Sequence, residues 1–261
     1  MKNKHNFTEK NFASMLLEYN YDLHLGDIIA GTVFNLEQKG YLVDIGAQIA
    51  GYLPNEETSL DNKSSTCLKS YNQITRDFFI LAYKKNSQQI LLSIKRLDYI
   101  RAWKRIKQIY AEDTILYSPI IRINKGGIIL YIEGLQGFIP NSHLTKTPLS
   151  YTKDNTIEYQ ILIADEKNNR LILSNKRAVL TLAKDKLRMG IIIEGKIIAI
   201  KRYGVFIEIN NIPALLHISE IGYKYIDNLN DLFTVGHYTK VKIIHIDIKQ
   251  GRLSLTKKGI Y

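Results

Sequence analysis

The most regular segment of the sequence reads Gly195-Lys-Ile-Ile-Ala-Ile-Lys-Arg-Tyr-Gly204-Val-Phe-Ile-Glu-Ile209. Apolar residues alternate with others through Val205, Ile207 and Ile209, which is the periodicity of a β-strand with one buried face. Gly204 interrupts the pattern, as expected at a bulge or a tight bend. The segment therefore predicts β-structure that changes direction near Gly204.

The residues that follow predict the rest of one small domain. Residues 214–220 form a short apolar segment, residues 238–246 alternate again, and residues 247–252 have the composition of a turn before a last strand at 253–256. Five short strands in about 70 residues are typical of a small closed barrel of the oligonucleotide-binding class. Closure of such a barrel removes the exposed strand edges that favour aggregation.

The same order of segments occurs twice more, earlier in the chain. Gly40 and Gly127 each precede an alternating strand, and Gly51-Tyr-Leu-Pro54 and Gly137-Phe-Ile-Pro140 follow them. Each copy ends on a strand that contains Leu-Ser. Repetition at this scale indicates a tandem array, and we expect a mainly β chain of three tandem five-stranded OB-fold barrels joined by short helices. The expected domains are a helical segment at 1–24, barrels at 25–95, 112–174 and 188–261, and helical linkers at 96–111 and 175–187.

The expected linkers have helical periodicity. Within Lys95–Ile109 the apolar stripe contains Leu97, Ile100, Trp103 and Ile106. Residues 175–189 follow a similar pattern, and Thr8 resembles the N-cap of a helix over residues 9–18. We expect Trp103 to pack between its helix and a barrel rather than to stack on a base.

The charge balance favours a polyanionic partner. Lys and Arg number 36 against 25 acidic residues, for a net charge of +11 and a pI of about 9.4. The sequence contains no apolar run of about 18 residues, and its basic residues form no amphipathic stripe, so we expect no membrane partner. Nucleic acid is the favoured partner.

Two local features limit the compartment and the chemistry. Cys67 is the single cysteine, so neither an internal disulfide nor a cysteine-based zinc site is expected. Met1–Lys10 has no apolar signal core and does not have the composition of an organelle import signal. We therefore expect the protein to work where it is made.

The abundance of Ile, Lys, Asn and Tyr hints at an AT-rich genome.

The third copy contains the best candidate site, because aromatic and basic residues are interleaved there. Aromatic faces stack on bases for about 1–3 kcal/mol per base, and Lys and Arg neutralise phosphates. Phe206 is out of phase with Val205 and Ile207, so it should lie on the outer face. Taken singly, Tyr203 and Phe206 are ordinary packing aromatics and His217 is an ordinary structural histidine. Taken together, they favour binding of single-stranded RNA. The predicted site consists of Lys201, Arg202, Tyr203, Phe206, His217, Asp247 and Arg252.

These residues carry a family resemblance. Tyr203-Gly-Val-Phe206, Leu216-His-Ile-Ser219 and Gly251-Arg-Leu-Ser-Leu255 resemble the motifs of the S1 RNA-binding domain. The resemblance implies that the expected barrels are S1-type. It also implies RNA contacts at Tyr203, Phe206, His217, Asp247 and Arg252.

The whole chain resembles the ribosomal protein S1 family, in its short plastid or cyanobacterial form. The similarity includes Phe7-Thr8, Phe12-Ala13, Leu92-Ser-Ile-Lys-Arg96 and Gly137-Phe-Ile-Pro140. It implies a small-ribosomal-subunit protein that binds mRNA and supports translation initiation. With the missing import signal and the AT-rich bias, it suggests a protein of the chloroplast stroma that is encoded in the plastid genome. The alternative is a bacterial cytoplasm.

The first two copies depart from the RNA-contact pattern. Lys39, Leu42 and Pro54 replace Tyr203, Phe206 and His217 in the first copy, and Gly126, Ile129 and Pro140 replace them in the second. In the resembled family, N-terminal copies dock on the ribosome while later copies hold message, and we carry this division over as a hypothesis. Weaker contacts to the RNA backbone are expected from Lys39, Lys84, Lys85, Arg122, Lys125 and Arg170.

Three other classes of function compete with this interpretation: an enzyme, a free RNA-binding protein and a protein scaffold. His217, His237 and His245 are spaced as strand residues, and no H-E-x-x-H, P-loop or G-x-G-x-x-G motif is present. We therefore expect no catalysis, metal, cofactor or small-molecule substrate. A free RNA-binding protein, such as a messenger-stability factor or an RNA chaperone, remains the main alternative. A pure protein scaffold would have no affinity for RNA.

Overall fold

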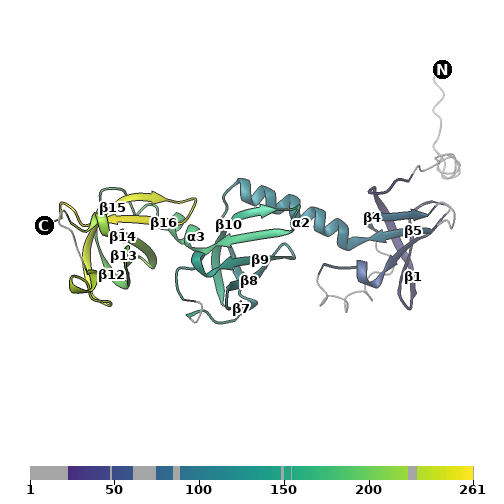
Figure 1. The fold of residues 1–261 in the computed structure, drawn as a ribbon. Helices are drawn as coiled ribbons and strands as arrows, with labels where there is room; N and C mark the ends of the chain where they lie inside the picture. The colour runs from purple at the N-terminus through teal and green to yellow at the C-terminus, as the bar shows by residue number, and fades with distance from the viewer. Residues whose placement is uncertain are drawn as a thin grey trace, which may run out of the picture. The chain divides into compact units, whose positions relative to one another are not determined.

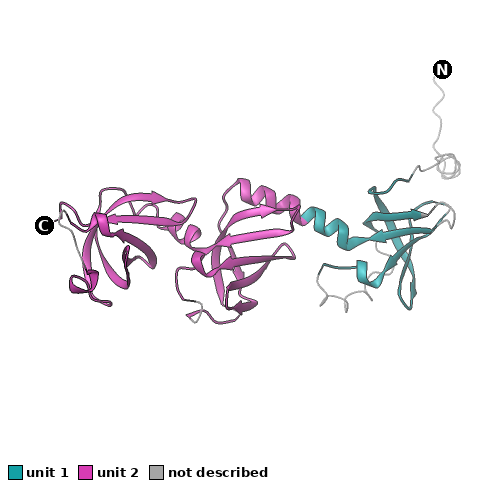
Figure 2. Ribbon diagram, in the orientation of Figure 1, with its two compact units in different colours: residues 1–101 teal, residues 102–261 magenta. Residues whose placement is uncertain are grey.

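The computed structural model describes residues 23–47, 49–60, 75–84, 89–147, 150–153, 155–222 and 228–260. The expected N-terminal helix, Cys67 and Lys85 lie outside these residues. The chain divides into two compact units, residues 1–101 and residues 102–261, and the boundary falls within helix α2 (Ile94–Ala111) (Figure 2). Each unit is described by itself.

The first unit contains a closed barrel whose strands have the order β1-β2-β3-β5-β4. Its core includes Val43, Phe78, Ile80 and Leu92, all of which are fully buried. Its elements are β1 (Ile28–Glu37), β2 (Gly40–Asp44), β3 (Gly51–Pro54), η1 (Asn55–Glu57), β4 (Thr75–Lys84) and β5 (Gln89–Ser93).

After α2, the second unit continues with a six-stranded OB-like sheet, called the second barrel below, in which the first strand of the expected five-stranded barrel is split in two. Ile120, which is fully buried, and Ile121 separate β6 from β7. The sheet has the order β6-β10-β11-β9-β8-β7. Its elements are β6 (Leu116–Pro119), β7 (Arg122–Asn124), β8 (Gly127–Ile132), β9 (Leu135–Pro140), η3 (Asn141–His143), β10 (Thr156–Asp165) and β11 (Arg170–Ser174).

The same unit ends with a closed barrel of order β12-β13-β14-β16-β15 (Figure 1). Val205, Ile207 and Ile209 are buried in its core, as their alternation predicts. The expected mainly β fold with three barrels is therefore confirmed. The elements are β12 (Ile192–Lys201), β13 (Gly204–Ile209), β14 (Ile212–His217), η5 (Ile218–Glu220), η6 (Leu229–Asp231), β15 (Tyr238–Asp247) and β16 (Arg252–Thr256).

The recurring glycine has the same structural role in all three barrels. Gly40, Gly127 and Gly204 each begin the second strand and face the last residue of the third strand. A Cβ on any of them would overlap a carbonyl oxygen of that third strand. Gly204 therefore does not interrupt a strand: it follows a turn, and the irregularity of β12 lies between Ile197 and Ala199.

This close approach predicts the result of a simple substitution. Gly127→Ala is expected to destabilise the second unit by about 1–3 kcal/mol, because the new methyl group meets the Ile139 carbonyl and one of the strands must shift. The adjacent Gly126→Ala is the matched control, since its Cβ would make only an ordinary contact of 3.6 Å with the Phe138 ring. Urea unfolding of both variants measures the difference, and equal stability would contradict this explanation.

The two described helices differ in how well the sequence predicts them. In α2, Leu97, Trp103 and Ile106 are buried, so the expected packing role of Trp103 is confirmed. Helix α3 (Asn175–Leu182) is shorter than the predicted 175–189. The apolar pattern continues past the end of α3 because Leu187 is also buried. The backbone before Leu187 forms a turn rather than a helix, and Leu187 packs in the core of the third barrel. Neither described helix is long and apolar enough to cross a membrane.

Helix α3 contacts both the second and the third barrel. On the second barrel, Arg177 donates from Nη1 to the Ile161 carbonyl (2.9 Å) and pairs with Asp113 (2.6 Å), while Asn175 donates to the Glu158 carbonyl (2.9 Å). Leu180 belongs to the core of the third barrel. Because one helix is bonded to one barrel and packed into the other, its N-terminal residues lie where the two barrels meet.

Candidate nucleic-acid interface

One outward-facing row crosses four strands of the third barrel. Phe206 of β13 faces Leu215 of β14, Leu215 faces Ser254 of β16, and Ser254 faces His245 of β15. All four side chains are half-buried or exposed, whereas the intervening Val205 and the other inward residues form the core. Phe206 therefore lies on the outer face, with its ring outside the barrel interior.

Tyr203 completes an aromatic platform beside this row. It lies in the turn between β12 and β13, and its side chain is 52% exposed. Its ring centroid is 6.2 Å from that of Phe206, and the ring planes cross at 87°. Since an edge-to-face pair covers the face of only one of its two rings, the pair leaves aromatic surface on which a base can stack.

His217 lies next to the platform, at the exposed end of β14. It faces Gly204, so no opposing side chain covers it from β13. The backbone N–H of Ser219 donates to its Nδ1 at 3.3 Å, and the Ser219 hydroxyl is 2.8 Å from the same nitrogen. A neutral ring that accepts at Nδ1 carries its proton on Nε2, which makes this imidazole a hydrogen-bond donor toward an RNA oxygen.

Basic side chains flank the platform. Lys201 and Arg202 are exposed and line a cleft of about 460 Å³, together with Asn228 and Asn230 of the η6 segment. Arg252 is exposed on β16 and faces Asp247 across the hairpin. The Asp247 carboxylate accepts from the Gln250 N–H (3.0 Å), so this acid orders the turn next to Arg252.

The structure brings six predicted residues to one region of the third barrel and places Asp247 at the end of β15, opposite Arg252. Sequence reasoning missed Leu215, Ser254 and His245, which share the row of Phe206. Their alternation with core residues was visible in the sequence, but their mutual proximity depends on strand register. Among the described residues, no cluster of His, Cys, Asp and Glu could hold a metal ion.

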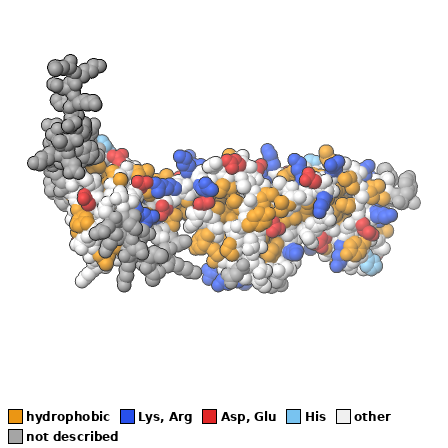
Figure 3. Space-filling view, turned by 180° about the vertical axis from the view of Figure 1, so that it is seen from behind, with side chains coloured by type: hydrophobic (Ala, Val, Ile, Leu, Met, Phe, Trp, Pro, Cys, Tyr) orange, Lys and Arg blue, Asp and Glu red, His pale blue; other side chains and the backbone are white. Residues whose placement is uncertain are grey.

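The expected backbone contacts are dispersed over the other two barrels. Lys39, Arg122, Lys125 and Arg170 are exposed, while the side chain of Lys84 lies outside the described structure. On the face drawn in Figure 3, Lys and Arg side chains are scattered among apolar and polar ones. These residues therefore do not form a second site comparable to that of the third barrel.

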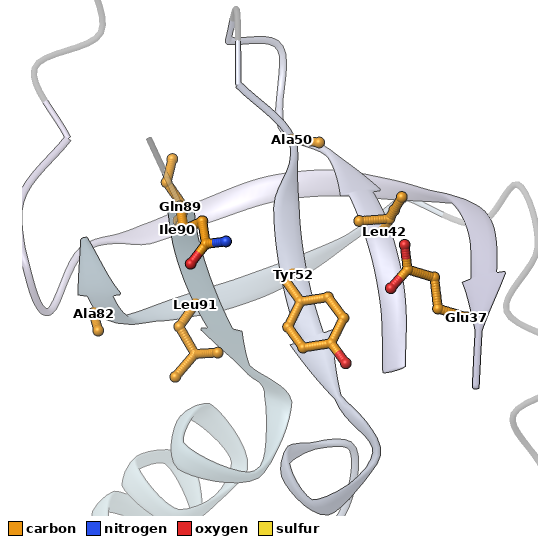
Figure 4. Close-up of a pocket in the computed structure, with 8 residues that line it drawn as sticks. All are labelled: Glu37, Leu42, Ala50, Tyr52, Ala82, Gln89, Ile90 and Leu91. Atoms are coloured by element: carbon orange, nitrogen blue, oxygen red, sulfur yellow. The ribbon is translucent and has the colours of Figure 1, made fainter. Parts of the chain in front are cut away.

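The corresponding face of the first barrel has a different chemistry. By strand register, Leu42 and Tyr52 replace Phe206 and Leu215, and Glu37 and Gln89 replace Lys201 and Arg252. These residues line a cleft of about 560 Å³, in which Tyr52 lies between Leu91 and Glu37 (Figure 4). An acid and an amide stand where the third barrel has cations, which disfavours a phosphate backbone.

The second barrel is intermediate between the other two. Its outward row consists of Ile129, Phe138, Ile172 and Ile163, so it has one ring and no aromatic pair. It keeps the acid and the arginine of the last hairpin, where Asp165 faces Arg170. The rings of Tyr52 and Phe138 were not anticipated from the sequence, because they occupy the position of Leu215 rather than that of Phe206.

Comparison with known proteins agrees with this architecture. The model of the S1 RNA binding domain matches residues 110–176 and 186–258, which contain the second and third barrels. The chain is 48% identical to the small ribosomal subunit protein bS1c of Pyropia yezoensis, over 99% of both chains. It is 47% identical to bS1c of Porphyra purpurea, again over 99% of both.

A third relative extends the similarity beyond Pyropia and Porphyra. The chain is 40% identical to the small ribosomal subunit protein bS1 of a Synechococcus strain, over 97% of this chain and 83% of that one. All three relatives carry the name of a ribosomal protein, and none of these names describes an enzyme. The resemblance found in the sequence is thereby confirmed, and the chain belongs to the S1 family of small ribosomal subunit proteins, in its plastid and cyanobacterial form.

Proposed function

We propose that this protein is the S1 component of the small ribosomal subunit of a plastid, where its third barrel holds single-stranded mRNA and supports the start of translation. The observation that carries the proposal is the Tyr203–Phe206 pair on the outer face of that barrel, 6.2 Å between ring centroids, with basic side chains around it. The plastid relatives with near-complete coverage support the ribosomal assignment.

RNA binds this face through two kinds of contact. Bases stack on Tyr203 and Phe206. This contact accepts any RNA sequence, because every base has an aromatic face. Lys201, Arg202 and Arg252 neutralise phosphates, so the affinity falls as the salt concentration rises. His217 donates from Nε2, and Asp247 keeps the hairpin in the shape that presents Arg252. Such a site suits a protein that must hold many different messages.

The first barrel has another role in this proposal. Its equivalent face carries Glu37 and Leu42 in place of Lys201 and Phe206, so stacking and phosphate contacts are both weakened there. We assign ribosome docking to the N-terminal part of the chain and message binding to the third barrel. Tighter RNA binding by the first two barrels than by the third would overturn this division.

We propose two further properties of the protein. It binds RNA without cleaving it, so labelled RNA incubated with the protein should remain intact. Its gene lies in the plastid genome, a view supported by the Ile-, Lys-, Asn- and Tyr-rich composition. Detection of the gene in isolated plastid DNA would test the second property.

Gradient sedimentation distinguishes the ribosomal role from that of a free RNA-binding protein. An extract is divided, one half is treated with nuclease, and both halves are separated at moderate salt. A subunit-bound protein is expected to migrate with the small subunit in both halves. A protein that follows message alone would move to the top of the gradient after nuclease treatment, which would favour the messenger-stability or chaperone alternative.

A further inference from the structure

One residue position, in the turn after the third strand of each barrel, is acidic in the first and third barrels but not in the second. The turn after the third strand contains Glu57 in the first barrel, His143 in the second and Glu220 in the third, by the register of Pro54, Pro140 and His217. Glu57 accepts from the Ser93 hydroxyl at 2.6 Å. In the second barrel, the equivalent Ser174 hydroxyl lies 3.1 Å from Nδ1 of His143. A carboxylate is therefore replaced by an imidazole at this point.

A lysine follows the last strand of every barrel, two residues beyond the position of Ser93 and Ser174. In the third barrel this residue, Lys258, pairs with Glu220 at 3.7 Å. Its counterpart in the second barrel, Lys176, has no carboxylate within ion-pair distance among the described residues. It donates instead to the Ser142 carbonyl at 2.7 Å. The exchange of Glu for His thus leaves Lys176 without the counter-charge that Lys258 has.

The third barrel adds another cation to the same place. The β15–β16 hairpin of the third barrel packs against the start of α3. The approach is so close that a Cβ built on Gly251 would lie 3.0 Å from the Cβ of Lys176. The next residue is Arg252. Burial, and then the charge of Arg252, lower the pKa of Lys176. Burial also lowers the pKa of His143, with further contributions from Lys176 and Arg252. Two cations, Lys176 and Arg252, therefore gather beside the His143 imidazole where the two barrels meet.

Arg252 links this cluster to the aromatic platform. Side chains alternate along a strand, so Arg252 lies on the same face of β16 as Ser254, whose row contains Phe206. An RNA strand whose base stacks on Phe206, and whose backbone follows β16, therefore reaches Arg252 and then Lys176. Gathered cations repel one another, and an anion placed between them removes this repulsion.

We propose that Lys176, His143 and Arg252 together bind one phosphate of the RNA backbone, so that message leaving the third barrel continues onto the second. This inference rests on the proposed function, because it takes the ligand of the third barrel to be RNA. It makes the two barrels of the second unit one continuous binding surface, and it adds Lys176 and His143 to the residues that contact RNA.

The test uses the full chain, a twelve-nucleotide oligouridine and two matched variants. Lys176→Gln is expected to lower the affinity about fivefold at 0.1 M salt and to reduce the slope of log affinity against log salt by about 0.7, the effect of one phosphate contact on a single strand. Lys258→Gln, the equivalent residue with a carboxylate partner, should leave both unchanged. Equal effects of the two variants would overturn the inference.

A second variant restores the missing acid. His143→Glu places at this position the residue found in the other two barrels, and Glu should pair with Lys176. RNA affinity is expected to fall while the melting temperature stays the same or rises. Unchanged RNA affinity would contradict the inference, as would a change confined to the binding of inorganic phosphate, measured separately.

Failure of the inference is distinguishable from failure of the proposed function. The reference is a variant in which Tyr203 and Phe206 are both alanine. If this variant loses RNA while Lys176→Gln does not, the phosphate site is wrong and the message-binding face remains. If neither variant loses RNA, the proposed function itself is wrong.

Discussion

Replacement of both Tyr203 and Phe206 by alanine is expected to weaken the binding of single-stranded RNA to the full chain by at least about 30-fold. Each ring is expected to contribute about 1–3 kcal/mol of stacking energy, and a loss of about 1.4 kcal/mol is tenfold in affinity. The salt dependence should stay the same, because neither ring carries a charge. Fluorescence anisotropy with a labelled oligouridine at several salt concentrations measures both quantities.

The control for this prediction is Leu42→Ala in the first barrel. Leu42 occupies the strand position of Phe206, but it is aliphatic, and it lies in a cleft with Glu37 and with Tyr52, the residue it faces on β3. Its loss should leave the affinity within about twofold of the wild type, since no stacking surface is removed. Equal losses in the two barrels would show that binding does not depend on the aromatic platform. Circular dichroism should confirm that both variants remain folded.

The second large effect concerns stability. Trp103→Ala is expected to lower the free energy of unfolding by about 3–5 kcal/mol, because Trp103 is 1% exposed and its removal leaves a large cavity beside α2. Tyr110→Ala on the same helix is the control: Tyr110 is 42% exposed, and its loss should change stability by less than about 0.5 kcal/mol. Urea unfolding followed by circular dichroism compares the two.

Trp103 also supplies a test that needs no variant. It is the only tryptophan of the sequence, so the intrinsic tryptophan fluorescence reports on this residue alone. Because it is buried, RNA bound to the third barrel should leave that fluorescence nearly unchanged. Strong quenching by RNA would place the binding surface next to α2 and contradict the present assignment.

The fold was readable from the sequence because its signals are local. Period-two alternation marks the strands, and the buried Val205 and Ile207 confirm which side of the strand faces the core. Repetition of the same order of segments revealed the three barrels. The end of α3 was predicted seven residues too late, because a buried residue such as Leu187 keeps the apolar period whether the backbone is helical or turned.

The site was only partly readable, because it depends on contacts between segments distant in the sequence. Phe206 and His245 share a row only through the pairings β13–β14, β14–β16 and β16–β15. A parallel pairing between β14 and β16 is not encoded by any hairpin. The cluster around Lys176 depends further on how one barrel's hairpin is seated on the helix that follows another. No single-sequence pattern specifies these contacts.

Photo-crosslinking tests the central claim most directly. A uniformly labelled single-stranded RNA is cross-linked to the full chain by ultraviolet light, and the attached residues are identified by mass spectrometry of the digested complex. The account predicts cross-links concentrated at Tyr203 and Phe206, with few at Leu42 and Tyr52 on the matching face of the first barrel. Cross-links concentrated on the first barrel, with Tyr203 and Phe206 unmodified, would contradict it.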